Sequence, residues 1–214
     1  LLALGLVAAL LESKESKKGQ VVDAAMTDGS ALLMTMIYTM QSSGMWKTTM
    51  GSNLLDGGSH FYDTYECKDK KFISIGSIEP QFYALLCQIA ELDEKVFDKQ
   101  MSRDLWPAQK EEIKKIFLNK TRDEWCELME GTDVCFAPVL DMSEAPKHPH
   151  NIERKTFINL EGVTQPAPAP RFSRTEAKVV SSPSIVGEHT DEVLSSIGLS
   201  EEDISSLKTS GAVA

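Results

Sequence analysis

The hydrophobic positions of this 214-residue chain change their spacing several times, from a helical repeat to the alternation of a strand. Apolar residues at helical spacing predict helices over residues 1–13, 23–43, 80–91, 107–119, 122–130, 191–197 and 201–208, the first of them buried. Aromatic and β-branched runs predict strands over residues 20–22, 61–67, 72–77 and 134–140. Residues 60–145 are therefore predicted to form a compact α+β unit.

Two stretches outside that unit have a different character. The chain does not begin with methionine, and its first 11 residues form an apolar run too short to span a membrane. They lack the basic leader and cleavage site of a signal peptide, so we expect a helix and a longer protein of which this chain is the C-terminal part. Residues 146–183 carry six prolines and few periodic apolar positions, which is typical of an extended linker.

Composition narrows the classes of function. The formal charge is −10, and an acidic chain does not attract polyanions, so nucleic-acid binding is not expected. The four cysteines have spacings that suit neither a zinc site nor a small disulfide scaffold, and reduced thiols favour an intracellular protein. The four histidines do not form a metal-binding set either, so we expect no metal.

One acidic residue stands at a junction where α/β proteins often bind ligands. Glu79 lies between a predicted strand that ends at residue 77 and a predicted helix that Pro80 opens. At this place a carboxylate meets free backbone N–H groups and the positive end of the helix dipole. Two roles are open: Glu79 caps its own helix, or it takes part in proton chemistry at a ligand site.

Two further features also leave alternatives open. Asp56 precedes two glycines, which favours a turn, although such glycines also let the backbone approach a ligand. Six of the nine methionines fall within 25 residues, where they form either a helix core or an adaptable apolar surface for a flexible acyl chain. These methionines are Met26, Met34, Met36, Met40, Met45 and Met50.

Several motifs taken together resemble one family. They are residues 19–26 (GQVVDAAM), 53–58 (NLLDGG), 61–67 (FYDTYEC), 76–83 (GSIEPQFY), 170–175 (PRFSRT) and 187–190 (GEHT). They look like the α-methylacyl-CoA racemases of the family III CoA-transferase superfamily, and the resemblance covers essentially the whole chain. The pair Glu79-Pro80 is more discriminating than the rest, because transferases of the formyl-CoA type tend to carry Asn-Asp there.

The resemblance implies an α/β fold in which a large Rossmann-like domain and a small α+β domain are joined by long linkers. It places residues 1–59 at the end of the large domain and in a linker helix, residues 60–145 in the small domain, residues 146–183 in a return linker, and residues 184–214 in helices that rejoin the large domain. It also implies an interlocked homodimer that uses no cofactor. Eukaryotic relatives work in peroxisomes and mitochondria, and a bacterial protein would be cytoplasmic.

The implied reaction is a 1,1-proton transfer that inverts the α-carbon of 2-methylacyl-CoA thioesters through an enolate. In the family, a histidine supported by a glutamate faces an aspartate, and the matching histidine and aspartate would lie upstream of this chain. Glu79 is the one member of the catalytic group that matches here, and Asp56 matches a different loop from that of the missing aspartate. We therefore expect the 214-residue chain alone to be inactive. The implied substrate-binding residues are Leu55, Tyr62, Ile78, Met26, Met36 and Met45.

Two rival functions stay open beside the racemase. A family III CoA transferase would form a covalent anhydride between an aspartate and the acyl group, and Glu79-Pro80 argues against it. A truncated, non-catalytic chain would only dimerise with a full-length partner or regulate it.

Overall fold

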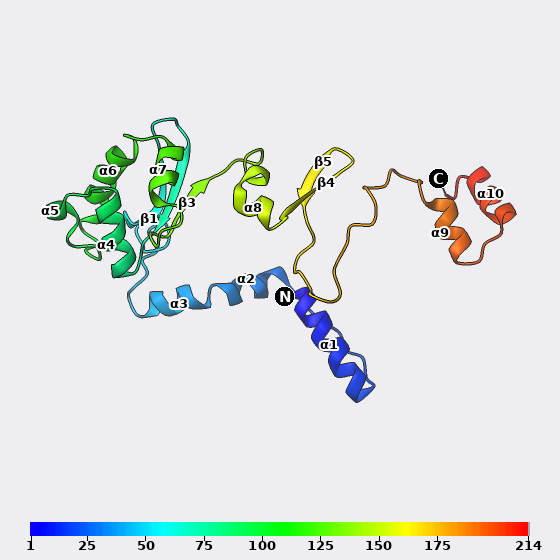
Figure 1. Ribbon diagram of the computed structural model, residues 1–214. Coiled ribbons are helices and arrows are strands. Elements are labelled where there is room, and N and C mark those ends of the chain that lie inside the picture. Colours follow the sequence, from blue (N-terminus) through cyan, green and yellow to red (C-terminus); the bar gives the residue numbers. More distant parts are fainter. Residues whose placement is uncertain (214) are drawn as a thin grey trace. The chain divides into compact units, whose positions relative to one another are not determined.

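Figure 1 shows the structure, a computed structural model that describes residues 1–213. Its helices are α1 (Leu2–Ser16), α2 (Met26–Leu33), α3 (Thr35–Ser42), α4 (Pro80–Ile89), α5 (Glu94–Phe97), α6 (Trp106–Phe117), α7 (Arg122–Met129), the 3₁₀-helix η1 (Ala145–Lys147), α8 (Pro149–Glu153), α9 (Thr190–Ser196) and α10 (Glu201–Thr209). Its strands are β1 (Tyr62–Glu66), β2 (Phe72–Gly76), β3 (Phe136–Val139), β4 (Phe157–Leu160) and β5 (Val163–Pro166). Within residues 1–213, no helix has both the length and the apolar character that a membrane crossing needs.

Contacts along the chain divide it into two units. The first contains residues 1–139, and the second begins at residue 140. The predicted four-part division, with boundaries after residues 59, 145 and 183, stays a prediction.

The first unit contains a three-stranded antiparallel sheet in the order β1–β2–β3. Tyr62 pairs with Gly76 where the hairpin opens, and Ile75 pairs with Phe136 on the third strand. Helices α4 to α7 gather around these strands (Figure 1). All three strands predicted within residues 60–145 are confirmed, each within two residues of its predicted bounds.

The helices around the sheet begin where their sequences supply suitable terminal residues. Pro80 occupies the first position of α4, where a missing N–H costs no hydrogen bond. Thr121 and Glu124 form a capping box at the start of α7, in which the Thr121 N–H donates to Glu124 Oε2 at 2.7 Å. The three helices predicted in this region are confirmed, whereas the short α5 was missed.

An aromatic core lies between the sheet and these helices. Phe61 meets Trp106 at a ring-centroid distance of 5.9 Å. Phe117 lies between Tyr65, at 5.2 Å, and Trp125, at 5.1 Å. All five side chains are at most 3% exposed, and Trp125 Nε1 donates to the Phe117 carbonyl at 3.0 Å. Large rings bury much apolar surface, and the indole N–H of Trp125 has a partner, so this core stabilises the sheet and its helices together.

A histidine is enclosed in the same core. His60 is fully buried, and its Nε2 lies 2.8 Å from the Tyr83 hydroxyl oxygen, while that hydroxyl donates to the Phe97 carbonyl at 2.9 Å. Because the hydroxyl proton is used on Phe97, Nε2 carries the ring proton and donates to Tyr83. Burial lowers the pKa of His60 to about 4, so the ring is neutral at neutral pH.

We predict that His60 makes the chain sensitive to mild acid. The folded histidine takes up a proton only near pH 4, whereas the unfolded one does so near pH 6.5, so the unfolded state binds more protons between these values. Lowering the pH from about 7 to about 5 should therefore remove about 2 kcal/mol of His60-dependent stability. Urea unfolding followed by the fluorescence of Trp106 and Trp125 measures this loss. The variant His60→Gln keeps a donor for Tyr83 but cannot titrate, and an undiminished pH dependence in it would contradict the prediction.

Residues 1–59 differ from the sequence prediction in three ways. The helix over residues 1–13 forms as α1, but none of its side chains is buried, and its leucines are 49% to 69% exposed. The strand over residues 20–22 is absent from the described structure, where no neighbouring strand pairs with it. The helix over residues 23–43 is two helices, α2 and α3, separated at Met34, whose φ of −82° and ψ of 0° leave the α-helical region.

The predicted linker over residues 146–183 is not uniformly extended. It contains α8 and the hairpin β4–β5, in which Leu160 pairs with Val163. The connecting residues Glu161 and Gly162 have positive φ values of 49° and 86°, as a type I′ hairpin turn requires. A glycine between two apolar runs was the sequence signal for this hairpin, and the high proline content concealed it.

Candidate functional site

The loop before β1 is built on one buried asparagine. Asn53 is fully buried, and its Nδ2 donates to Asp56 Oδ2 at 2.7 Å and to the Lys47 carbonyl at 2.9 Å. Asp56 also accepts from the backbone N–H groups of Asn53, at 2.7 Å, and Gly51, at 3.2 Å. Partial burial raises the pKa of Asp56, but the hydrogen bonds outweigh this effect and lower its pKa below the usual value. Asp56 therefore has the role of a turn residue, and the loop also approaches the cavity, because Asp56 and Gly57 both line it.

The same loop is tied to the sheet and to α6. Lys110 of α6 forms an ion pair with Asp63 of β1 and donates to the Gly57 carbonyl. Gly58 has no room for a side chain, because an added Cβ would lie 2.6 Å from the backbone N and O of Asn53. The loop is thus held in one position against β1.

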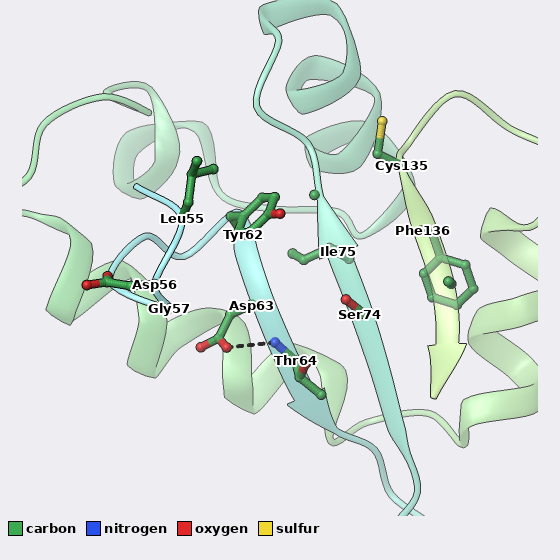
Figure 2. A pocket seen from close by; sticks show the side chains of 12 residues that line it. Leu55, Asp56, Gly57, Tyr62, Asp63, Thr64, Ser74, Ile75, Cys135 and Phe136 are labelled. Carbon is green, nitrogen blue, oxygen red and sulfur yellow. Dashed lines mark hydrogen bonds between the residues drawn. The ribbon is translucent and has the colours of Figure 1, made fainter. Parts of the chain in front are cut away.

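A cavity of about 460 Å³ opens between this loop and strands β1 to β3 (Figure 2). Leu55 of the loop and Tyr62 of β1 both line it, so the structure brings together two of the predicted substrate contacts. Figure 2 shows these two side chains close to each other, with Phe136 on the third strand. Gly76 also lines the cavity, and an added Cβ at this position would contact the Tyr62 ring at 3.5 Å.

Glu79 lies at the strand-to-helix junction, as predicted, and it is exposed. It directly precedes α4, and its carbonyl accepts from the Tyr83 N–H at 3.0 Å to close the first helical turn. Its carboxylate makes no capping hydrogen bond, and no partner within residues 1–213 forms a hydrogen bond or ion pair with it. The capping role is therefore wrong for this side chain, and the carboxylate is free to meet a group from outside the described residues.

Cys135 lines the cavity and is also affected by the charge of Glu79. This cysteine is exposed, lines the cavity and has a left-handed backbone conformation with a φ of 59°. Partial burial raises the pKa of its thiol, and the negative charges of Glu79 and Asp133 raise it further. The Gly76 N–H donates to the Cys135 carbonyl at 2.9 Å, so Cys135 lies against the end of β2, three residues before Glu79. Sequence reasoning placed Cys135 inside a strand, because nothing in the sequence signals its unusual backbone.

We predict that Cys135 is the first cysteine to be alkylated in the folded chain and that Glu79→Gln accelerates the reaction. Cys135 is the exposed thiol of the four, and removal of a nearby negative charge increases its thiolate fraction. Because the thiolate is the reacting form, we expect about a twofold acceleration near neutral pH. Mass spectrometry after iodoacetamide treatment gives the rate at each cysteine. Glu127→Gln is the control, since Glu127 is exposed on α7, and equal rates in the two variants would contradict the proximity of Glu79.

The remaining predicted site residues do not line this cavity. Ile78 is partly buried and packs against the aromatic core. Met26, Met36 and Met45 are 89%, 57% and 52% exposed, so the described methionine-rich helices do not form a buried core. Their role as an apolar surface for an acyl chain stays a prediction.

The arrangement offers a free carboxylate near a cavity of mixed lining, in which Leu55, Tyr62 and Phe136 stand beside polar residues that include Asp56 and Asp63. A carboxylate in this position can orient a second titratable group and stabilise its positive charge. Within its own unit, residues 1–139, Glu79 has no histidine partner, since His60 is the one histidine there and is enclosed in the core. In that same part, no group of three or more His, Cys, Asp and Glu side chains is placed to hold a metal ion.

Comparison with known families identifies the family of this chain. Residues 1–190 match the family described as CoA-transferase family III. The chain belongs to CoA-transferase family III. The solved structure of Rv3272 from Mycobacterium tuberculosis has the same fold, with a TM-score of 0.67 and 21% identity, over 89% of this chain and 52% of that protein. The α/β fold predicted from the resemblance is confirmed.

Two curated relatives of this family III chain are α-methylacyl-CoA racemases. The Mus musculus racemase is 46% identical over 204 residues, which are 94% of this chain and 53% of that protein. The Homo sapiens racemase is 41% identical over 209 residues, which are 97% of this chain and 55% of that protein. The resemblance based on the motifs is confirmed, and the chain spans about half the length of the curated relatives it matches.

Proposed function

We propose that the protein to which this chain belongs is an α-methylacyl-CoA racemase, which interconverts (R)- and (S)-2-methylacyl-CoA thioesters. The observation that carries this proposal is the exposed carboxylate of Glu79, unpartnered within residues 1–213, beside a cavity lined by Leu55 and Tyr62. The identity of 46% and 41% with two α-methylacyl-CoA racemases supports the substrate class.

The proposed reaction replaces the proton on the α-carbon by another that arrives from the opposite face. A base on one face of the α-carbon removes its proton, and the electron pair of the broken C–H bond moves into the thioester to form an enolate. An acid on the opposite face then supplies a proton to the α-carbon, which inverts its configuration. The negative charge that develops on the thioester oxygen requires preorganised hydrogen-bond donors. Nothing is oxidised or reduced, so we propose that the reaction uses no cofactor.

In this proposal Glu79 acts on the base and does not touch the substrate. A histidine from outside the chain takes up the α-proton, and Glu79 accepts a hydrogen bond from the other ring nitrogen. This bond fixes the tautomer and orientation of the ring and stabilises its charged form. Leu55 and Tyr62 would contact the acyl group near the reacting carbon, and the exposed Met26 and Met36 would extend the apolar surface.

The test of this function is proton exchange in the full-length protein. Incubation with one epimer of a 2-methylacyl-CoA in deuterated water should produce both epimers, with deuterium at the α-carbon. Absence of both epimerisation and deuterium uptake would overturn the proposal. CoA transfer to a free acid, together with an acyl–enzyme adduct trapped by hydroxylamine, would instead favour the CoA-transferase alternative.

We further propose that the full-length protein is an intracellular, interlocked homodimer, in peroxisomes or mitochondria if the source is a eukaryote. The exposed leucines of α1 support a further apolar contact, because exposed apolar surface of this extent usually marks an interface. The sequence upstream of this chain would distinguish the two hypotheses of a catalytic protein and a truncated partner. A racemase must supply its histidine and aspartate there.

A further inference from the structure

The backbone directly before Glu79 is held by one side chain from the loop between α5 and α6. Nε2 of Gln100 donates to the Ser77 carbonyl at 2.9 Å and to the Ile78 carbonyl at 2.9 Å. Strand β2 ends at Gly76, so these carbonyls lie beyond its ladder of hydrogen bonds. Both N–H groups of one amide are thus used on the two carbonyls that lead from the sheet to Glu79.

Gln100 is itself fixed by the core. The backbone carbonyl of Gln100 accepts from Trp106 Nε1 at 2.7 Å, and the Trp106 side chain is 3% exposed. These two hydrogen bonds from the Gln100 amide form a clamp on the backbone. On its other side, the fully buried Ser77 donates its backbone N–H to the Phe61 carbonyl at 3.0 Å. Both ends of the Gln100 contact therefore belong to the rigid part of the domain.

The Glu79 side chain has no comparable support. It is exposed, and its carboxylate makes no hydrogen bond or ion pair with the described residues. The backbone, held between residues Ser77 and Ile78 and the first turn of α4, therefore sets the position from which this side chain extends.

We propose that Gln100 is a positioning residue for Glu79, and that its two hydrogen bonds determine where the Glu79 carboxylate lies in the site. The inference rests on the proposed role of Glu79 in supporting the catalytic base. Without the clamp, the two carbonyls must find other donors and the junction can move. A displacement of about 1 Å at a catalytic group can lower a rate by up to about 100-fold.

The first test uses the 214-residue chain and the alkylation rate of Cys135 as a reporter of the Glu79 charge. We expect Glu79→Gln and Gln100→Leu each to accelerate the reaction about twofold, and the double variant to react no faster than Glu79→Gln alone. The matched control is Gln109→Leu, which removes another amide that donates to a backbone carbonyl, that of Val96 at 2.8 Å. This control should leave the Cys135 rate unchanged.

The second test measures racemisation by the full-length protein. Gln100→Leu should lower kcat about tenfold with little change in KM, because the substrate contacts stay in place. The acidic limb of the pH profile should shift to lower pH, as it should in Glu79→Gln, because a well-placed carboxylate raises the pKa of the histidine. In the Glu79→Gln background, Gln100→Leu should have no further effect on kcat, and Gln109→Leu should keep the wild-type pH profile.

The outcomes separate this inference from the proposed function. Wild-type kcat in Glu79→Gln overturns both. A strong effect of Glu79→Gln, with wild-type kcat and pH profile in Gln100→Leu, overturns the positioning role alone, as do fully additive effects in the double variant. If Gln100→Leu does not fold, Gln100→Glu replaces it, because its ionised carboxylate has a similar size but donates no hydrogen bond.

Discussion

Substitution of Glu79 by glutamine is expected to lower the kcat of the full-length protein about 10²- to 10³-fold, with little change in KM. Glutamine keeps the shape of the side chain and removes its charge. The proposed histidine base would then lose the carboxylate that orients it and stabilises its protonated form, while the proposed contacts of Leu55 and Tyr62 with the acyl group would remain. The loss should therefore appear in the chemical step, and α-deuterium exchange and epimerisation should fall together.

The structure makes Glu79→Gln a clean test. The Glu79 side chain is exposed and has no hydrogen bond or ion pair within residues 1–213, so its replacement removes no contact that stabilises this part of the fold. The urea midpoint should stay at the wild-type value. Glu127→Gln makes the same chemical change at an exposed position of α7 and should retain full activity. A kcat for Glu79→Gln within twofold of this control would contradict the assigned role.

Local sequence signals predicted the sheet region well, and the reason is physical. The hairpin β1–β2, the helix opened by Pro80 and the capping box of Thr121 and Glu124 each depend on residues close together in the chain. Their patterns therefore carry most of the information that determines them. The position of Glu79 between a strand and a helix followed from the same local signals.

Burial in residues 1–59 could not be predicted in the same way. The apolar run of α1 does determine a helix, but burial needs a surface to pack against, and the described residues do not provide one. The same holds for the segment 20–22, where a strand requires a neighbour to pair with. Sequence pattern predicts local conformation, whereas burial and pairing depend on segments distant in the chain.

The candidate site was predicted in part, for a related reason. Leu55 and Tyr62 meet at the cavity, and the family motifs identified both. The roles of Cys135 and Gln100 depend on contacts with residues far away in the sequence, such as the bond from Gln100 to the Ser77 carbonyl. The local sequence of Glu79 favoured a capping role, and only the three-dimensional geometry excludes it.

Substitution of Gly58 by alanine is expected to destabilise the chain by about 3 kcal/mol or more. An added Cβ would lie 2.6 Å from the Asn53 N and O and from the Ser52 carbonyl carbon, which are all backbone atoms that cannot rotate away. Relief of this overlap requires the loop to open, and that breaks the bond from the Gly58 N–H to the Asn53 carbonyl at 3.2 Å. It also exposes the fully buried Asn53 side chain, on which the bonds to Asp56 depend.

Gly131→Ala is the matched control for this prediction, since it separates overlap from backbone strain. Gly131 has a φ of 77° but open space around an added Cβ, so its replacement should cost only about 1 kcal/mol of backbone strain. Urea unfolding of both variants, followed by tryptophan fluorescence, gives the two free energies. A loss in Gly58→Ala no larger than in Gly131→Ala would show that the loop is free to relax. Because this loop carries Leu55 to the cavity, a rigid loop means that the shape of this cavity wall is fixed in the absence of a ligand.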